Sequence, residues 1–179
     1  MFFALWLLAA STTQPVPDAP PRADAQPRLA GAASPISPGL CERIADEAWR
    51  CVGLAGVDVR VFGPEARRTL SLGGDRPAFA PLPLPGRFAT MIDWQANGEG
   101  RPVAATVRWR AAEGSAELLL VLRPAADGSP GCLSAVAGPD ADAGELAARS
   151  FRCGRDRPIL AGTIPPTLRA ALEGWLSAL

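Results

Sequence analysis

The stretch that decides the fold class is VAATVRWR at residues 103–110, followed by AELLLVL at residues 116–122. In the first stretch, apolar side chains at the odd-numbered positions alternate with Thr106, Arg108 and Arg110, which is the period of a β-strand with one buried face. Apart from Glu117, the second stretch is a continuous apolar run, typical of a central strand that is covered on both faces. Together they predict two neighbouring strands in the core of a sheet.

Shorter strands with the same period are predicted on either side, at residues 57–61, 70–72, 90–94 and 132–137, separated by turns rich in Gly and Pro. Two helices are expected near 142–151 and 165–179. Asp142 with Glu145 forms a capping-box arrangement for the first helix, and Pro165 and Pro166 start the second. We therefore expect a mainly β fold with C-terminal helices (α+β), with an antiparallel sheet arranged as a sandwich or a small barrel.

Composition narrows the possible functions of the 179-residue chain. Its 18 basic residues, all of them arginine, balance 18 acidic residues, so no net field favours nucleic acid as a partner. Hydrophobic residues make up 48% and charged residues 20%, a balance typical of a folded domain. The chain has no His, Lys or Tyr, which excludes imidazole bases, His metal sites, Schiff-base lysines and phenolic acids. We expect no cofactor and no metal.

The N-terminal region predicts export. Residues 2–10 (FFALWLLAA) form an apolar run followed by small residues, so residues 1–11 are predicted to be a signal peptide. The run is about half the roughly 20 residues that span a bilayer, and no transmembrane anchor is expected after processing. Residues 12–40 are Pro- and Ala-rich and predict a flexible tether. This leaves 41–179 as a single domain, in a periplasmic or secreted protein.

The four cysteines Cys41, Cys51, Cys132 and Cys153 predict two disulfides, because their number is even and the chain is expected to be exported. Of three connectivities we favour Cys41–Cys51 with Cys132–Cys153. A hairpin with residues 45–47 as its loop would place the first two cysteines opposite each other, within disulfide range. A short helix over 42–50 is the competing local structure. The second bond would clamp the first predicted helix onto the sheet.

Arginines supply the candidate ligand-binding residues. The strand positions of Arg60, Arg108, Arg110 and Arg123 allow them to line one solvent-exposed face, where guanidinium groups can bind phosphate, carboxylate or sulfate bidentately. The alternative is an ordinary solvated sheet face whose charges are balanced by nearby acids.

The order of several motifs resembles an uncharacterised family of small exported alphaproteobacterial proteins. The motifs include Trp49-Arg50-Cys51, Ile92-Asp93-Trp94 and Phe151-Arg152-Cys153, and the likeness covers residues 41–153. That family supplies no function. Trp49-Arg50-Cys51 and Pro85-Gly86-Arg87-Phe88 are also similar, more weakly, to segments of the periplasmic inhibitors of C-type lysozyme, small disulfide-bonded β-barrels.

Three functions therefore stay open. The first is an exported, non-catalytic binding or interaction module, with a periplasmic protein or a cell-envelope component as its partner. The second is an inhibitor of a cell-wall hydrolase, which would need an exposed loop that inserts into a cleft. The third is an enzyme that uses only carboxylates or arginines, which would need a pocket where two carboxylates approach each other.

Overall fold

The computed structural model describes residues 32–114, 116–126 and 131–179. Within these ranges the chain forms eleven strands, two α-helices and two short 3-10 helices. In chain order the elements are β1 (Ala33–Pro35), η1 (Pro38–Leu40), β2 (Glu42–Ala45), β3 (Ala48–Leu54), β4 (Val57–Phe62), η2 (Glu65–Arg67), β5 (Thr69–Leu72), β6 (Gly86–Phe88), β7 (Met91–Ala96), β8 (Pro102–Ala111), β9 (Glu117–Arg123), β10 (Cys132–Ala137), α1 (Ala143–Ala148), β11 (Ile159–Ala161) and α2 (Pro166–Ser177).

The strands form two sheets. The larger has seven strands. Six of them follow the order β1-β7-β8-β9-β10-β11, and β6 pairs with the part of β8 that β7 does not cover. The smaller has the order β2-β3-β4-β5. All pairings are antiparallel except that of β10 with β11, which is parallel. The fold is therefore mainly β with two C-terminal helices, as the alternation of residues predicts, and its larger sheet is mixed.

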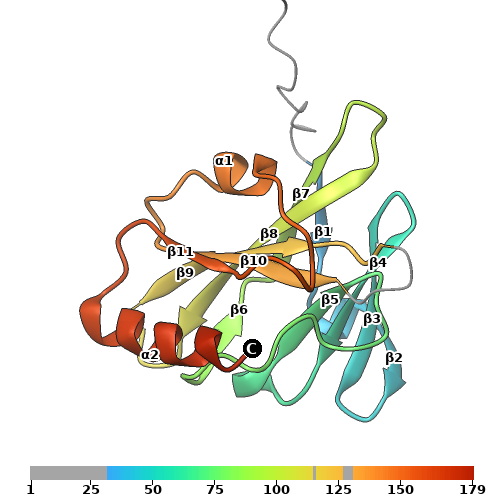
Figure 1. The fold of residues 1–179 in the computed structure, drawn as a ribbon. Helices are drawn as coiled ribbons and strands as arrows, with labels where there is room; N and C mark the ends of the chain where they lie inside the picture. The colour runs from blue at the N-terminus through green and yellow to red at the C-terminus, as the bar shows by residue number, and fades with distance from the viewer. Residues whose placement is uncertain (1–31, 115, 127–130) are drawn as a thin grey trace, which may run out of the picture.

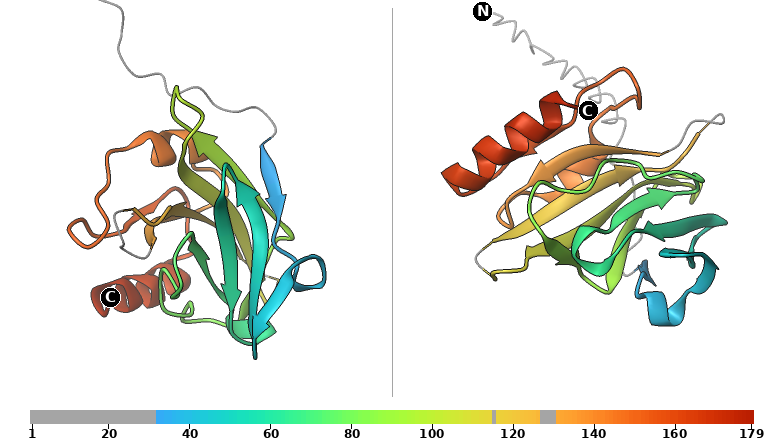
Figure 2. Two further views of the ribbon diagram at one scale, coloured as in Figure 1. Left: turned by 90° about the vertical axis from the view of Figure 1, so that its right-hand side faces the viewer. Right: turned by 90° about the horizontal axis from the view of Figure 1, so that it is seen from below.

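Three layers result from this arrangement. The four-stranded sheet and α2 lie on one face of the seven-stranded sheet, and α1 lies on the opposite face (Figure 1; Figure 2 gives the perpendicular views). The main core fills the space on the first side and includes Trp94, Val107, Trp109 and Leu120. A smaller cluster under α1 contains Val121, with the helix residues Leu146 and Ala147 and the small residues Ala104, Ala135 and Ala137.

The two stretches that decide the fold behave as predicted. On β8, Val107 and Trp109 are 1% and 3% exposed in the main core, while Arg108 between them is exposed on the other face. The continuous apolar run of β9 is buried on both sides, because Leu120 faces the main core and Val121 faces α1. The predicted strands at 57–61, 70–72, 90–94 and 132–137 correspond to β4, β5, β7 and β10.

The folded domain begins before Cys41, within the residues assigned to the flexible tether. β1 pairs with β7, and the indole Nε1 of Trp94 donates a hydrogen bond of 3.0 Å to the hydroxyl of Ser34. Ile36 is only 4% exposed, so it belongs to the core. Burial of Ile36 and this pairing hold a Pro-containing segment in place. The predicted signal peptide 1–11 and the tether up to residue 31 lie outside the described residues.

Both disulfides join the predicted partners. Cys41 and Cys51 are connected across the β2–β3 hairpin, with 4.5 Å between their Cα atoms. The competing short helix does not form, because the chain reverses at Asp46-Glu47, where Glu47 adopts a φ of 50°. Cys132 at the start of β10 is bonded to Cys153 beyond α1, with 5.6 Å between the Cα atoms.

The first helix is shorter than predicted. Its N-cap is Asp142, whose carboxylate accepts hydrogen bonds from the backbone N–H groups of Gly144 and Glu145, as the capping arrangement predicts. The helix ends at Ala148 rather than near Phe151. Arg149 is extended there, and its carbonyl accepts a 2.7 Å hydrogen bond from the Arg123 guanidinium. The second helix is close to its predicted bounds and packs on the domain through the buried side chains of Leu168 and Leu172.

Candidate anion-binding site

The four arginines predicted to line one face are not brought together. Arg60 lies on β4 of the four-stranded sheet, whereas Arg108, Arg110 and Arg123 lie on β8 and β9 of the other sheet. Arg60 is half-buried, and its Nε atom is buried without a hydrogen-bond partner among the described residues. The remaining three arginines share a sheet face but differ in what they contact.

Arg108 and Arg110 share one carboxylate. Their guanidinium groups donate hydrogen bonds of 2.7 and 2.9 Å to the two oxygens of Glu117, which lies opposite Arg110 on β9. Hydrogen bonds from Arg110 and then Arg108 hold the pKa of the Glu117 carboxyl below its usual range. This cluster matches the alternative expected from the sequence, a sheet face whose charges are balanced by a nearby acid.

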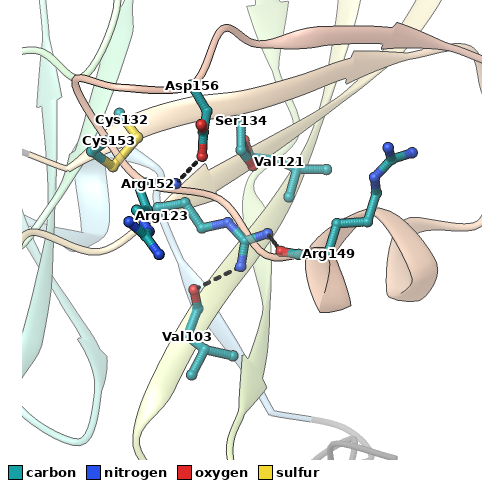
Figure 3. Close-up of a disulfide and its surroundings, with 9 residues drawn as sticks. All are labelled: Val103, Val121, Arg123, Cys132, Ser134, Arg149, Arg152, Cys153 and Asp156. Carbon is teal, nitrogen blue, oxygen red and sulfur yellow. Dashed lines mark hydrogen bonds between the residues drawn. A yellow bond between two sulfur atoms is a disulfide. The ribbon is translucent and has the colours of Figure 1, made fainter. Parts of the chain in front are cut away.

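The guanidinium of Arg123 binds backbone carbonyl groups of the protein itself. Its guanidinium donates to the carbonyl oxygens of Val103 at 3.3 Å and Arg149 at 2.7 Å, and so joins β8 to the end of α1 (Figure 3). Burial lowers the pKa of the Arg123 guanidinium. A guanidinium that already serves several carbonyl groups has few donors left for a ligand.

A different group of arginines follows α1. Residues 149–157 (RSFRCGRDR), which we call the basic loop, contain Arg149, Arg152, Arg155 and Arg157 with Asp156 as the only acid, a net charge of +3. Because the whole chain is neutral, the other residues together carry −3. All four arginines are exposed, and in the described part of the chain none of their guanidinium groups has a hydrogen bond or an ion pair.

The basic loop is held at several points. Cys153 is bonded to Cys132 on β10, and the carbonyl of Arg149 accepts from Arg123 (Figure 3). Within the loop, the backbone N–H of Arg152 donates a 2.6 Å hydrogen bond to the carboxylate of Asp156. The only acid of the loop therefore binds backbone. Four cations are presented on a fixed framework, and such preorganisation reduces the entropy lost on binding.

Sequence reasoning missed this cluster for an identifiable reason. Strand alternation points only to arginines that lie on strands, and the predicted helix over 142–151 includes the first residues of the loop. The signal was nevertheless present, because four arginines fall within nine residues that contain only one acid. Arginine-rich segments between regular elements are where guanidinium groups most readily converge on an anion.

The described residues contain neither a metal-binding cluster nor a helix that could cross a membrane. No three or more residues among His, Cys, Asp and Glu lie close enough together to hold a metal ion. None of the helices there is both long enough and apolar enough to cross a membrane. The two disulfides are consistent with a protein that folds outside the cytoplasm, where thiols are not kept reduced.

Comparisons with protein-family models, with curated proteins and with solved structures found no match to this chain.

Proposed function

We propose that this protein is an exported, non-catalytic module that binds an anionic partner through the basic loop. The observation that carries the proposal is the set of four exposed guanidinium groups that have no carboxylate partner among the described residues, in a loop whose backbone is held by the Cys132–Cys153 bond. Like charges within one short segment repel one another and lower stability, and a bound anion reduces that repulsion. Guanidinium groups also match the planar oxygen pairs of phosphate and carboxylate.

The available side chains support a non-catalytic role. His, Lys and Tyr are absent from the chain, and the four cysteines are bonded in disulfides. Acid–base chemistry would thus fall to carboxylates, and a general acid needs a raised pKa. Among the described residues, the carboxyl groups of Glu117 and Asp140 both have a pKa below the usual range. For Asp140 the cause is hydrogen bonding from the backbone N–H and hydroxyl of Thr163.

The likeness to lysozyme inhibitors draws no support from its loop-like segment. Gly86–Phe88 is strand β6, and it pairs with β8 instead of projecting outward. A Cβ at Gly86 would lie 2.2 Å from a ring carbon of Trp109, so this glycine allows close packing of the strand against an indole. The predicted location, periplasmic or secreted, rests on the signal-like residues 1–11 and on the two disulfides.

The proposal is tested by titrating the purified protein with inorganic tripolyphosphate in a calorimeter at low salt. We expect saturable binding that weakens as salt rises, since the Debye length falls to about 10 Å at 0.1 M. Arg152→Gln with Arg155→Gln should weaken binding at least about tenfold. The matched control is Arg108→Gln with Arg110→Gln, which removes the same charge from groups already bonded to Glu117 and should leave binding within about twofold.

Either of two results would refute this function. The first is the absence of saturable tripolyphosphate binding to the unsubstituted protein at low salt. The second is an equal loss of affinity in both double variants, which would mean that overall charge, not the basic loop, attracts the anion.

A further inference from the structure

A hollow of about 400 Å³ adjoins the basic loop. Its charged side chains are Arg155, Arg157 and Asp156, all exposed. Its apolar part comes from three elements: Phe151 of the basic loop, Leu133 of β10 and Leu176 near the end of α2. The size lies within the range of about 300–1,000 Å³ that is usual for small-molecule sites.

The apolar part is only partly covered by the protein itself. Leu133 is 2% exposed and forms the closed side of the hollow, while Phe151 and Leu176 are half-buried. Leu179, which also lines the hollow, is 57% exposed. A ligand that covered these side chains would gain roughly 25 cal/mol for each Å² of apolar surface removed from water. A purely ionic ligand would leave that gain unused.

Asp156 also lines the hollow, and it does not cancel the two cations. Its carboxylate accepts the backbone N–H of Arg152, and no ion pair joins it to an arginine of the basic loop in the described residues. The side chains that line the hollow therefore carry a net charge of +1, from Arg155 and Arg157 against Asp156, beside an apolar surface. That combination is complementary to one chemical class, an acyl or alkyl chain with an anionic head.

A second hollow is apolar but has no basic side chain among the described residues that line it. It is of similar size, about 440 Å³, and lies between α2 and the β8–β9 turn, with Leu84 and Leu168 among its apolar residues. Among the described residues its only charged side chain is that of Glu113, so no charged side chain in it attracts an anion. Leu84 is 40% exposed there. This second hollow is the natural control for binding that depends on apolar contact alone.

We propose, building on the proposed function, that the hollow beside the basic loop binds a single-chain anionic amphiphile. The phosphate or carboxylate head contacts Arg155 and Arg157, and the chain lies against Leu133, Phe151 and Leu176. The ligand is taken up as a monomer, because a concave site of this volume accepts one chain and not the surface of a bilayer.

The test compares three probes by calorimetry, each below its micelle concentration: octyl phosphate, methyl phosphate and octyl glucoside. Octyl phosphate should bind at least about tenfold more tightly than methyl phosphate, because each fully buried methylene contributes about 0.8 kcal/mol. Octyl glucoside should bind at least about tenfold more weakly than octyl phosphate, because its head is neutral.

Substitutions then show which hollow binds the octyl chain of the ligand. Leu179→Ser and the pair Arg155→Gln with Arg157→Gln should each weaken octyl phosphate binding several-fold. Leu84→Ser, which removes an exposed leucine from the second hollow, should leave octyl phosphate binding unchanged. Leu179→Ser should also leave tripolyphosphate binding unchanged, since it alters only the apolar contact.

The outcomes separate this inference from the function on which it rests. Equal affinities for octyl and methyl phosphate would overturn the hollow as a chain site while leaving tripolyphosphate binding by the basic loop intact. Loss of octyl phosphate binding in Leu84→Ser would place the chain in the other hollow. Preference for anionic vesicles over monomeric octyl phosphate would identify a membrane surface as the ligand. Absence of tripolyphosphate binding would refute the proposed function itself.

Discussion

Removing the Cys132–Cys153 bond tests the preorganisation of the basic loop. The bond closes a loop with a sequence separation of 21, for which the chain-entropy relation gives about 3.3 kcal/mol of stabilisation at 25 °C. The Cys41–Cys51 bond, with a separation of 10, corresponds to about 2.7 kcal/mol in the same relation. Replacing either pair by alanine should therefore cost similar stability, so each double variant is a control for the other.

Ligand affinity should differ between the two variants. Without Cys153 the basic loop regains backbone freedom that tripolyphosphate must then remove, and fixing one residue costs about 1–2 kcal/mol. Because 1.4 kcal/mol is a factor of ten, ordering a single residue is enough for a loss of about tenfold. The Cys41–Cys51 variant should keep its affinity. Urea unfolding gives the two stabilities, and calorimetry at a temperature where both variants are folded gives the two affinities.

Three results would refute this reasoning. Unchanged affinity after removal of Cys132–Cys153 would mean that the loop needs no anchor to bind. Equal loss of affinity in both variants would point to general destabilisation. Four free thiols in the native protein under oxidising conditions would contradict the disulfide framework.

Further expectations concern single side chains. Glu117→Gln should destabilise the protein at neutral pH by about 0.2–1 kcal/mol for each lost ion pair. Because folding lowers the pKa of Glu117, the difference in stability between the two proteins should disappear as pH falls through that pKa. Urea unfolding from neutral pH to about pH 3 measures this difference, and a constant difference would contradict the prediction. Gly86→Ala should lower the free energy of unfolding by about 1–3 kcal/mol, because the added Cβ would overlap the Trp109 ring. Gly98→Ala is the control, because no atom lies within 4 Å of the Cβ that it adds. Equal melting temperatures of the two variants would contradict this prediction. Arg123→Met should lower the free energy of unfolding by about 1–3 kcal/mol, because the hydrogen bonds from the charged guanidinium to two carbonyl groups are lost. An unchanged melting temperature would mean that these hydrogen bonds do not stabilise the protein.

Local patterns were sufficient for part of the fold. Side chains of a strand alternate between faces, so the residues of β8 and β9 predicted both strands and the burial of Trp109. The Cys41–Cys51 pairing followed from a hairpin of few residues. The capping of α1 by Asp142 likewise depended only on near neighbours in the sequence.

Other features depend on partners far along the chain. β1 is held by β7, and Ser34 meets Trp94 across 60 residues, so a Pro-containing segment gave no sign of its strand. β11 has only three residues and pairs in parallel with β10. The end of α1 is set by Arg123, 26 residues away from the carbonyl that it binds. Propensity and periodicity carry no information about such contacts.

The candidate site shows the same division. The ion pair of Glu117 with Arg110 could have been predicted from the sequence, because the hairpin of β8 and β9 places the two residues opposite each other. The clustering of arginines after α1 was visible as composition. That these arginines have no ion-pair partner in the described part of the chain, and that a hollow lies beside two of them, could be learned only from the three-dimensional arrangement.

The basic loop occupies part of the crossover between the parallel strands β10 and β11. The register of these strands, with Ala135 opposite Ile159 and Ala137 opposite Ala161, is fixed by the sheet and does not involve the arginine side chains. Exposed substitutions in the loop therefore leave the framework unchanged. We therefore expect that the charge of this crossover can be lowered or reversed by substitution, with a change in the anion binding proposed above, while the same scaffold continues to fold.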